Sequence, residues 1–283
     1  MKERSLDIRK LEGVSNLQND KIYIYMSSVR DEFLKNCVNH NVPLGHFTKK
    51  WDSRNLNNIL MEEYGSHILD PNVIAERLNS ACDKLKSIVA GKNKVLFVCT
   101  KKIGKSYIKK TATDVGMPYV TEKWFGGILT NFIVLKKMIK RVESMNSLKT
   151  SPSFQLRSKK EQRILLSSIH KNNVVLDGIN DRFFRLPGAL IVVDIKKENI
   201  AVNEAKKMGI PVFGLVDTNA NPDLVSDPIP CNDDSLKSII FVIEHLKNAI
   251  NEGLSETNNS NSEFSEVDNA NSDEDNYTEE KEE

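Results

Sequence analysis

The fold is decided by one continuous apolar stretch, Lys94-Val95-Leu96-Phe97-Val98-Cys99-Thr100. An unbroken apolar run of this length is typical of a strand that is buried on both faces of a parallel sheet. Two similar runs follow at 189–194 and 210–216, and helical segments separate them. Strands that alternate with helices predict an α/β fold with a doubly wound, Rossmann- or flavodoxin-like, mainly parallel sheet.

The helices of this fold are marked by residues at their ends. Asp70-Pro71 predicts an N-cap followed by proline at the first helical position, and Gly91 ends that helix after Ala90. Further helices are predicted over 105–115, 199–208 and 233–251. We also expect a short helix around 31–44, a loop over 44–51, and short strands at 66–69 and 119–120.

The alternation is interrupted between 129 and 178. Two helical segments, 131–148 and 158–172, are joined by a turn at 149–153. The interruption carries ten basic and three acidic residues. This pattern predicts an antiparallel helical hairpin that protrudes from the sheet.

Composition excludes several classes of protein. The chain has 283 residues, of which 39% are hydrophobic, enough for one large core. No stretch approaches the ~20 consecutive apolar residues of a membrane span, and the acidic first residues do not resemble a secretory signal. The four cysteines are widely spaced and contain no C-x-x-C pair, so we expect no disulfide framework and a cytoplasmic setting.

The formal net charge of +1 is the sum of two parts of the chain with opposite charge. Residues 252–283 hold twelve acidic residues and one basic residue, whereas 1–251 carry a net charge of +12. This asymmetry indicates a body that faces nucleic acid and an acidic tail with too few apolar residues to fold. The expected organisation is an N-terminal extension (1–30), an α/β domain (31–128 and 179–251), the hairpin insertion (129–178) and a disordered acidic tail (252–283).

A lysine-rich turn, Thr100-Lys101-Lys102-Ile103-Gly104-Lys105-Ser106, follows the first buried strand and ends like a P-loop. A P-loop also needs a glycine where Cys99 stands, so the match fails. The turn precedes a helix N-terminus, where the helix dipole favours anions, and RNA phosphate is a suitable ligand. The alternative is a solvated turn with no ligand.

Other polar residues give weaker signals. Cys37, His40 and His46 lack a fourth zinc ligand at a suitable spacing. Asp217-Thr218-Asn219 follows a strand, where α/β sheets bind ligands, but we favour turn and cap chemistry as the explanation of these residues. Trp51 and Trp124 are candidates for stacking on an RNA base, an interaction worth ~1–3 kcal/mol, although core packing also explains Trp124.

Several motifs, taken in order, resemble one family. They are Gly45-His46-Phe47 with Lys49-Lys50-Trp51, Leu96-Phe97-Val98-Cys99-Thr100-Lys101-Lys102, Trp124-Phe125-Gly126-Gly127-Ile128-Leu129-Thr130-Asn131-Phe132, Leu186-Pro187-Gly188-Ala189-Leu190, Ile210-Pro211-Val212, Val216-Asp217-Thr218-Asn219 with Asn221-Pro222-Asp223, and Ile229-Pro230-Cys231-Asn232-Asp233-Asp234. The region 42–250 is similar to the bacterial-type small-subunit ribosomal protein S-two family.

The resemblance implies a non-catalytic structural protein of the small ribosomal subunit. It implies binding to small-subunit rRNA at the junction of head and body, and contact with neighbouring ribosomal proteins, including the mRNA-binding protein S-one. It implies a bacterial, ribosome-associated protein with no cofactor, no metal, no membrane partner and no small-molecule substrate. The candidate rRNA-binding residues are Lys49, Lys50, Trp51, Arg54, Lys101, Lys102, Lys105, Lys123, Trp124, Lys136, Lys137, Lys140 and Arg141.

Two alternatives belong to other functional classes. The first is a nucleotide- or sugar-phosphate-binding enzyme on a Rossmann-like sheet, because fold alone does not settle function. Such an enzyme needs convergent polar residues in a pocket at the strand ends. The second is an RNA-binding regulator that acts outside the ribosome, which the basic body also permits.

Overall fold

The computed structural model describes residues 32–179 and 185–275, and side chains as far as Thr257. The expected extension at 1–30 lies outside these residues. The central sheet is parallel throughout, with the strand order β5-β4-β6-β7-β8. Its strands are β4 (Val95–Val98), β5 (Tyr119–Val120), β6 (Ala189–Val193), β7 (Val212–Val216) and β8 (Asp227–Pro230). The predicted α/β fold class is therefore confirmed.

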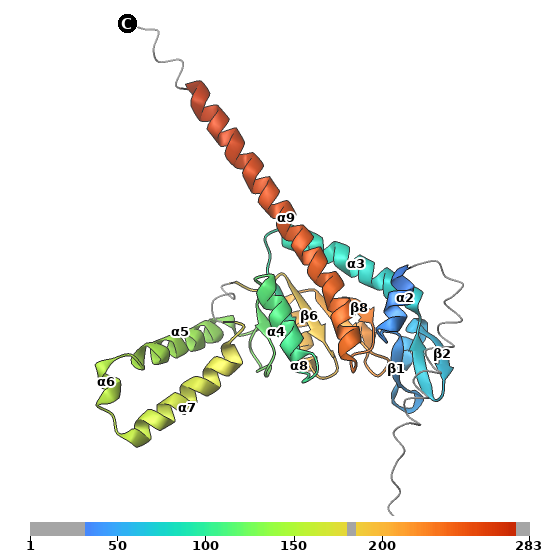
Figure 1. Ribbon diagram of the computed structural model, residues 1–283, viewed down its shortest axis with the longest axis horizontal. Coiled ribbons are helices and arrows are strands. Elements are labelled where there is room, and N and C mark those ends of the chain that lie inside the picture. The colour runs from blue at the N-terminus through green and yellow to red at the C-terminus, as the bar shows by residue number, and fades with distance from the viewer. Residues whose placement is uncertain (1–31, 180–184, 276–283) are drawn as a thin grey trace, which may run out of the picture.

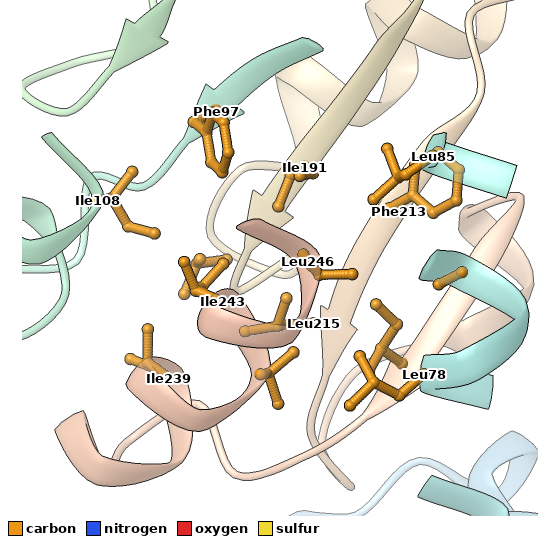
Figure 2. Close-up of a cluster of buried hydrophobic side chains, with 14 of the residues drawn as sticks. Leu78, Leu85, Phe97, Ile108, Ile191, Phe213, Leu215, Ile239, Ile243 and Leu246 are labelled. Carbon is orange, nitrogen blue, oxygen red and sulfur yellow. The ribbon is translucent and has the colours of Figure 1, made fainter. Parts of the chain in front are cut away.

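Helices cover both faces of this sheet. Residues that alternate along β4 point to opposite sides, so Phe97 and Leu96 belong to different apolar clusters. One face packs against α3 (Pro71–Ala90), α4 (Lys105–Asp114) and α9 (Leu236–Asp275). Figure 2 shows this cluster, in which side chains of α3, α4 and α9 meet Phe97, Ile191 and Phe213 of the strands.

The other face packs against α8 (Asn199–Met208) and the start of α5 (Phe132–Leu148). Two-sided burial explains why β4, β6 and β7 are entirely apolar and why the sequence predicts them clearly.

The predicted caps of α3 and α8 are present. The Asp70 side chain accepts a hydrogen bond from the Asn72 N–H at 2.8 Å, and Pro71 occupies the first turn of α3. Gly209 ends α8 in the left-handed conformation, with φ of 68°. Such local signals fix the helix ends independently of the rest of the fold.

The small antiparallel sheet matches the prediction in the strand at 66–69 and differs from it elsewhere. It has the order β1-β3-β2, formed by β1 (Leu44–Phe47), β3 (Ser66–Leu69) and β2 (Ile59–Glu63). It follows α2 (Glu32–Asn39), and the loop expected over 44–51 is in fact β1 followed by the 3-10 turn η1 (Thr48–Lys50). Both strand pairs contain register shifts, which removes the two-residue periodicity that marks a strand.

The last helix is also longer than predicted. α9 continues beyond Asn251 to Asp275 and extends past α3 (Figure 1). Lys86 of α3 lies 2.8 Å from Glu256 and 3.4 Å from Glu252, and Leu254 packs against the core. The first turns of the acidic segment after Glu252 therefore continue the helix that covers the sheet.

The hairpin leaves and rejoins the body beside the edge strand β5. It consists of α5, the short α6 (Pro152–Gln155) and α7 (Lys159–Leu176), and it projects away from the sheet (Figure 1). Ser158 and Glu161 form a capping box at the start of α7. At the other end, the Tyr119 N–H donates to the Gly178 carbonyl oxygen at 3.1 Å, which ties the returning chain to β5.

A substitution at Gly178 tests this junction, because a Cβ atom at that position would lie 2.1 Å from the Tyr119 carbonyl oxygen. We expect Gly178→Ala to lower the free energy of unfolding by about 1–3 kcal/mol, the usual cost of overpacking. Urea denaturation followed by circular dichroism measures the change. Gly126→Ala is the control, since its Cβ would meet no atom closer than 4.0 Å. Equal stability of the two variants would contradict the proposed junction.

Candidate nucleic-acid interface

Lys101 is the centre of an ion network at the carboxyl edge of the sheet. It follows β4, and its Nζ lies 2.8 Å from Asp233, 2.6 Å from Asp234 and 3.6 Å from Asp194. Only 16% of the Lys101 side chain is exposed. Burial favours neutral lysine, but the hydrogen bonds to Asp233 and Asp234 outweigh it and raise the pKa of Lys101. Lys101 therefore neutralises carboxylates of the protein and is not a free cation for RNA phosphate.

His46 extends this network to the small sheet. Its Nδ1 lies 3.0 Å from Asp217 and its Nε2 lies 3.1 Å from Asp234, while its backbone N–H donates to the Thr218 hydroxyl at 2.9 Å. The hydrogen bond to Asp217 outweighs burial and raises the pKa of His46. These contacts fix β1 against the end of β7.

The same residues include a geometric candidate for a metal site. Among the described residues, His46, Asp233 and Asp234 offer ligand atoms that all lie within 4.8 Å of one another. In this arrangement Lys101 already satisfies Asp233, and both Lys101 and His46 contact Asp234. The carboxylates of this candidate site are therefore already paired with Lys101 and His46 of the protein itself.

A lysine-to-methionine substitution separates the roles of neighbouring lysines. We expect Lys101→Met to lower the free energy of unfolding by about 3 kcal/mol at pH 8, because it leaves buried Asp233 without a cation. The loss is smaller at pH 5, since burial raises the pKa of Asp233 to about 6 and the protonated, neutral acid needs no compensating cation. Denaturation midpoints at both pH values measure this. The control is the exposed neighbour, Lys102→Met, and equal losses in the two variants would contradict the network.

Trp124 is placed in the core and not on the surface. The residue is 6% exposed, and its indole N–H donates to Glu204 Oε1 at 3.2 Å. The ring of Trp124 therefore packs in the core of the fold, which is the alternative to base stacking given above. No local signal identifies the partner, because Glu204 lies 80 residues away on α8.

Glu204 organises the whole turn around Trp124. Its carboxylate accepts hydrogen bonds from the backbone N–H groups of Gly127 (2.7 Å), Leu129 (3.1 Å) and Thr130 (3.2 Å). Burial alone would raise the pKa of Glu204, but these donors lower it. This turn precedes α5, so Glu204 sets where the hairpin leaves the body.

The Glu204 carboxylate gives a pH-dependent prediction. We expect Glu204→Gln to lower the free energy of unfolding by about 2–3 kcal/mol at pH 7, because the amide cannot accept from all these donors. A lowered pKa means that the unfolded chain binds more protons, so wild type loses this contribution as pH falls below about 4.3. The gap between wild type and variant therefore narrows in acid.

Thermal denaturation at pH 7 and pH 3.5 measures that gap, with exposed Glu76→Gln as the control. A Glu204→Gln variant as stable as the control at pH 7 would show that the turn does not depend on the carboxylate.

The remaining candidates fall into three exposed groups. The first lies on the turns η1 and η2 (Ser53–Asn58), the second follows β4 and β5, and the third lies on α5. Their exposed basic residues are Lys49, Lys50 and Arg54; Lys102 and Lys123; and Lys136, Lys137, Lys140 and Arg141. Lys105 is half-buried and lies 3.0 Å from Glu122. The three lysines of this turn therefore differ in their surroundings. Lys102 is exposed, whereas Lys101 and Lys105 are paired with carboxylates.

The basic residues of α5 share one side of the helix. Leu135, Ile139 and Val142 are buried, which leaves the four basic residues on the exposed side. On α7, Arg163 and Lys171 line a hollow of about 510 Å³ together with serine and isoleucine side chains. Arg163 and Lys171 are among the ten basic residues of the predicted hairpin, and no local pattern distinguishes them from the other eight.

Comparison with known proteins places these features in a family. The family model described as Ribosomal protein S2 matches residues 38–253. The chain is similar to the "Small ribosomal subunit protein uS2" of Amoebophilus asiaticus, with 45% identity over 221 residues that cover 78% of this chain and 70% of the relative. It is 43% identical to the protein of the same description from Cytophaga hutchinsonii over 222 residues, covering 78% and 87% of the two chains.

A third relative of that description, from Porphyromonas gingivalis, is 41% identical over 212 residues, which are 75% of each chain. Within the described ranges, no helix combines the length and the apolar character that crossing a membrane requires.

Proposed function

We propose, because the chain belongs to the ribosomal protein S2 family, that its exposed basic groups bind small-subunit rRNA at the junction of head and body. The proposal assigns the contact to residues on η1, η2, the turns after β4 and β5, and α5. It assigns Lys101 and Trp124 to the stability of the fold.

Membership of the family fixes the broader function. The protein is a structural component of the small ribosomal subunit, acts in translation and is not an enzyme. As part of the subunit it binds rRNA and other ribosomal proteins. This rejects the alternative of a nucleotide- or sugar-phosphate-binding enzyme.

The basic side of α5 is the observation that carries the assignment of the contact surface. Four cations on one exposed side of a projecting hairpin suit the negative charge of an RNA backbone. Each neutralised phosphate releases counterions, so binding weakens as salt rises. Contact with the mRNA-binding protein S-one is proposed from the family resemblance.

A pair of matched double variants tests this surface. We expect Lys137→Gln with Lys140→Gln to weaken binding to small-subunit rRNA and to reduce the slope of log K against log salt by about one per lost phosphate contact. Filter binding of the full chain between 50 and 300 mM KCl measures the slope. The control neutralises exposed Lys206 and Lys207 of α8.

Sucrose gradients of lysates give the corresponding result in cells. We expect the wild-type chain to co-migrate with small subunits, and the α5 double variant to dissociate at a lower salt concentration than the α8 control. A chain that migrates free of the subunit at all salt concentrations would contradict assembly into the ribosome and would favour a separate RNA-binding regulator. Immunoblots of the same fractions test whether S-one stays bound.

A further inference from the structure

A cleft of about 380 Å³ opens at the carboxyl edge of the sheet, and its lining does not include Lys101 or the carboxylates paired with it. Its walls come from residues 50–52, from the connection between β6 and α8, and from the segment 219–224 after β7. Open α/β sheets bind ligands outside the carboxyl ends of their strands. A volume of this size is in the range of small-ligand pockets.

The walls of the cleft are held in place by buried hydrogen bonds. The Asn55 side-chain amide donates to the carbonyl oxygens of Thr218 at 3.2 Å and Ala220 at 2.5 Å. The Asp52 N–H donates to the Thr218 carbonyl oxygen at 2.8 Å. These bonds join the loop that carries Trp51 to the loop that carries Asn219, so the cleft is formed before any ligand enters.

Trp51 offers an aromatic surface to this cleft. Its ring centroid lies 5.0 Å from that of His67, which supports the indole from the small sheet, and 36% of Trp51 stays exposed. Every nucleic-acid base has a π-face that stacks on an indole.

Asn219 supplies a polar group with no partner. It lines the cleft, and its amide oxygen is buried yet has no hydrogen-bond partner among the residues that the structure describes. A buried carbonyl oxygen without a donor is costly, which points to a donor supplied by a ligand. The amino groups and ring N–H groups of bases are such donors.

Two lysines add positive charge to the lining of the cleft, which also contains Asp52. Lys50 and Lys196 are both exposed residues of this lining, and Lys196 Nζ donates to the backbone carbonyl oxygen of Asn219 at 3.3 Å. An aromatic platform, an unpaired amide oxygen and two cations match a base joined to a phosphate. We propose that this cleft takes one unstacked nucleotide of the small-subunit rRNA, with its base on Trp51 and its edge against Asn219.

This inference rests on the proposed rRNA binding and adds a specific site to it. The test assembles small subunits with the full-length chain or its variants and measures rRNA reactivity toward dimethyl sulfate and an acylating ribose probe, nucleotide by nucleotide. We expect Trp51→Leu and Asn219→Ala to raise reactivity at the same nucleotide by about fivefold or more, the factor that corresponds to loss of one stacked base. Trp51→Tyr keeps the aromatic surface and retains protection.

Controls use similar residues outside the cleft. Phe47→Leu alters an exposed aromatic ring, and Asn203→Ala alters an exposed amide on α8; we expect both variants to leave the rRNA reactivity unchanged. Variant subunits that contain the chain but show no changed nucleotide would overturn the cleft assignment and leave the ribosomal function intact. Absence of even the wild-type chain from subunits would instead overturn the ribosomal function.

A second measurement distinguishes RNA from free nucleotide. Adenosine monophosphate is titrated into the free full-length chain while tryptophan fluorescence is recorded. No saturable quenching below millimolar concentration is expected for a site that serves one nucleotide of a large RNA. Tight quenching that Trp51→Leu abolishes, combined with unchanged rRNA reactivity, would identify a free-nucleotide site and overturn the proposal.

Discussion

The fold depends on one ammonium group that holds three loops together at the carboxyl edge of the sheet. Lys101, after β4, contacts Asp194 after β6 and the pair Asp233 and Asp234 after β8. Without this cation, three carboxylates would repel one another and Asp233 would be buried uncompensated. Because this edge is where α/β enzymes place their active sites, the ion network also explains how an enzyme-like fold serves a structural role here.

The structure divides the basic residues into two kinds. Lys101 and Lys105 are paired with carboxylates, whereas Lys102 and the basic residues of α5 are exposed. Only exposed cations gain the counterion release that drives binding to an RNA backbone. The sheet therefore acts as a rigid base. The hairpin, whose ends are held by Glu204 and Gly178, places the basic side chains of α5 away from the sheet.

Much of the fold could be predicted because its signals are local. Two-sided burial makes β4, β6 and β7 apolar, and caps such as Asp70 and Gly209 mark helix ends. β8 was missed because Pro228 and Pro230 argue against a strand, although prolines are tolerated at a sheet edge. The partners of Lys101 and Trp124 could not be predicted, since they lie far away in sequence and only the folded chain brings them together.

The central claim is that adjacent lysines have different roles, and the salt dependence of rRNA binding tests it directly. The measurement compares Lys101→Met and Lys102→Met in the full chain, at a temperature where both are folded. The account predicts that Lys102→Met lowers the slope of log K against log salt by about one, while Lys101→Met leaves the slope of the wild type. A lowered slope for Lys101→Met and an unchanged slope for Lys102→Met would contradict it.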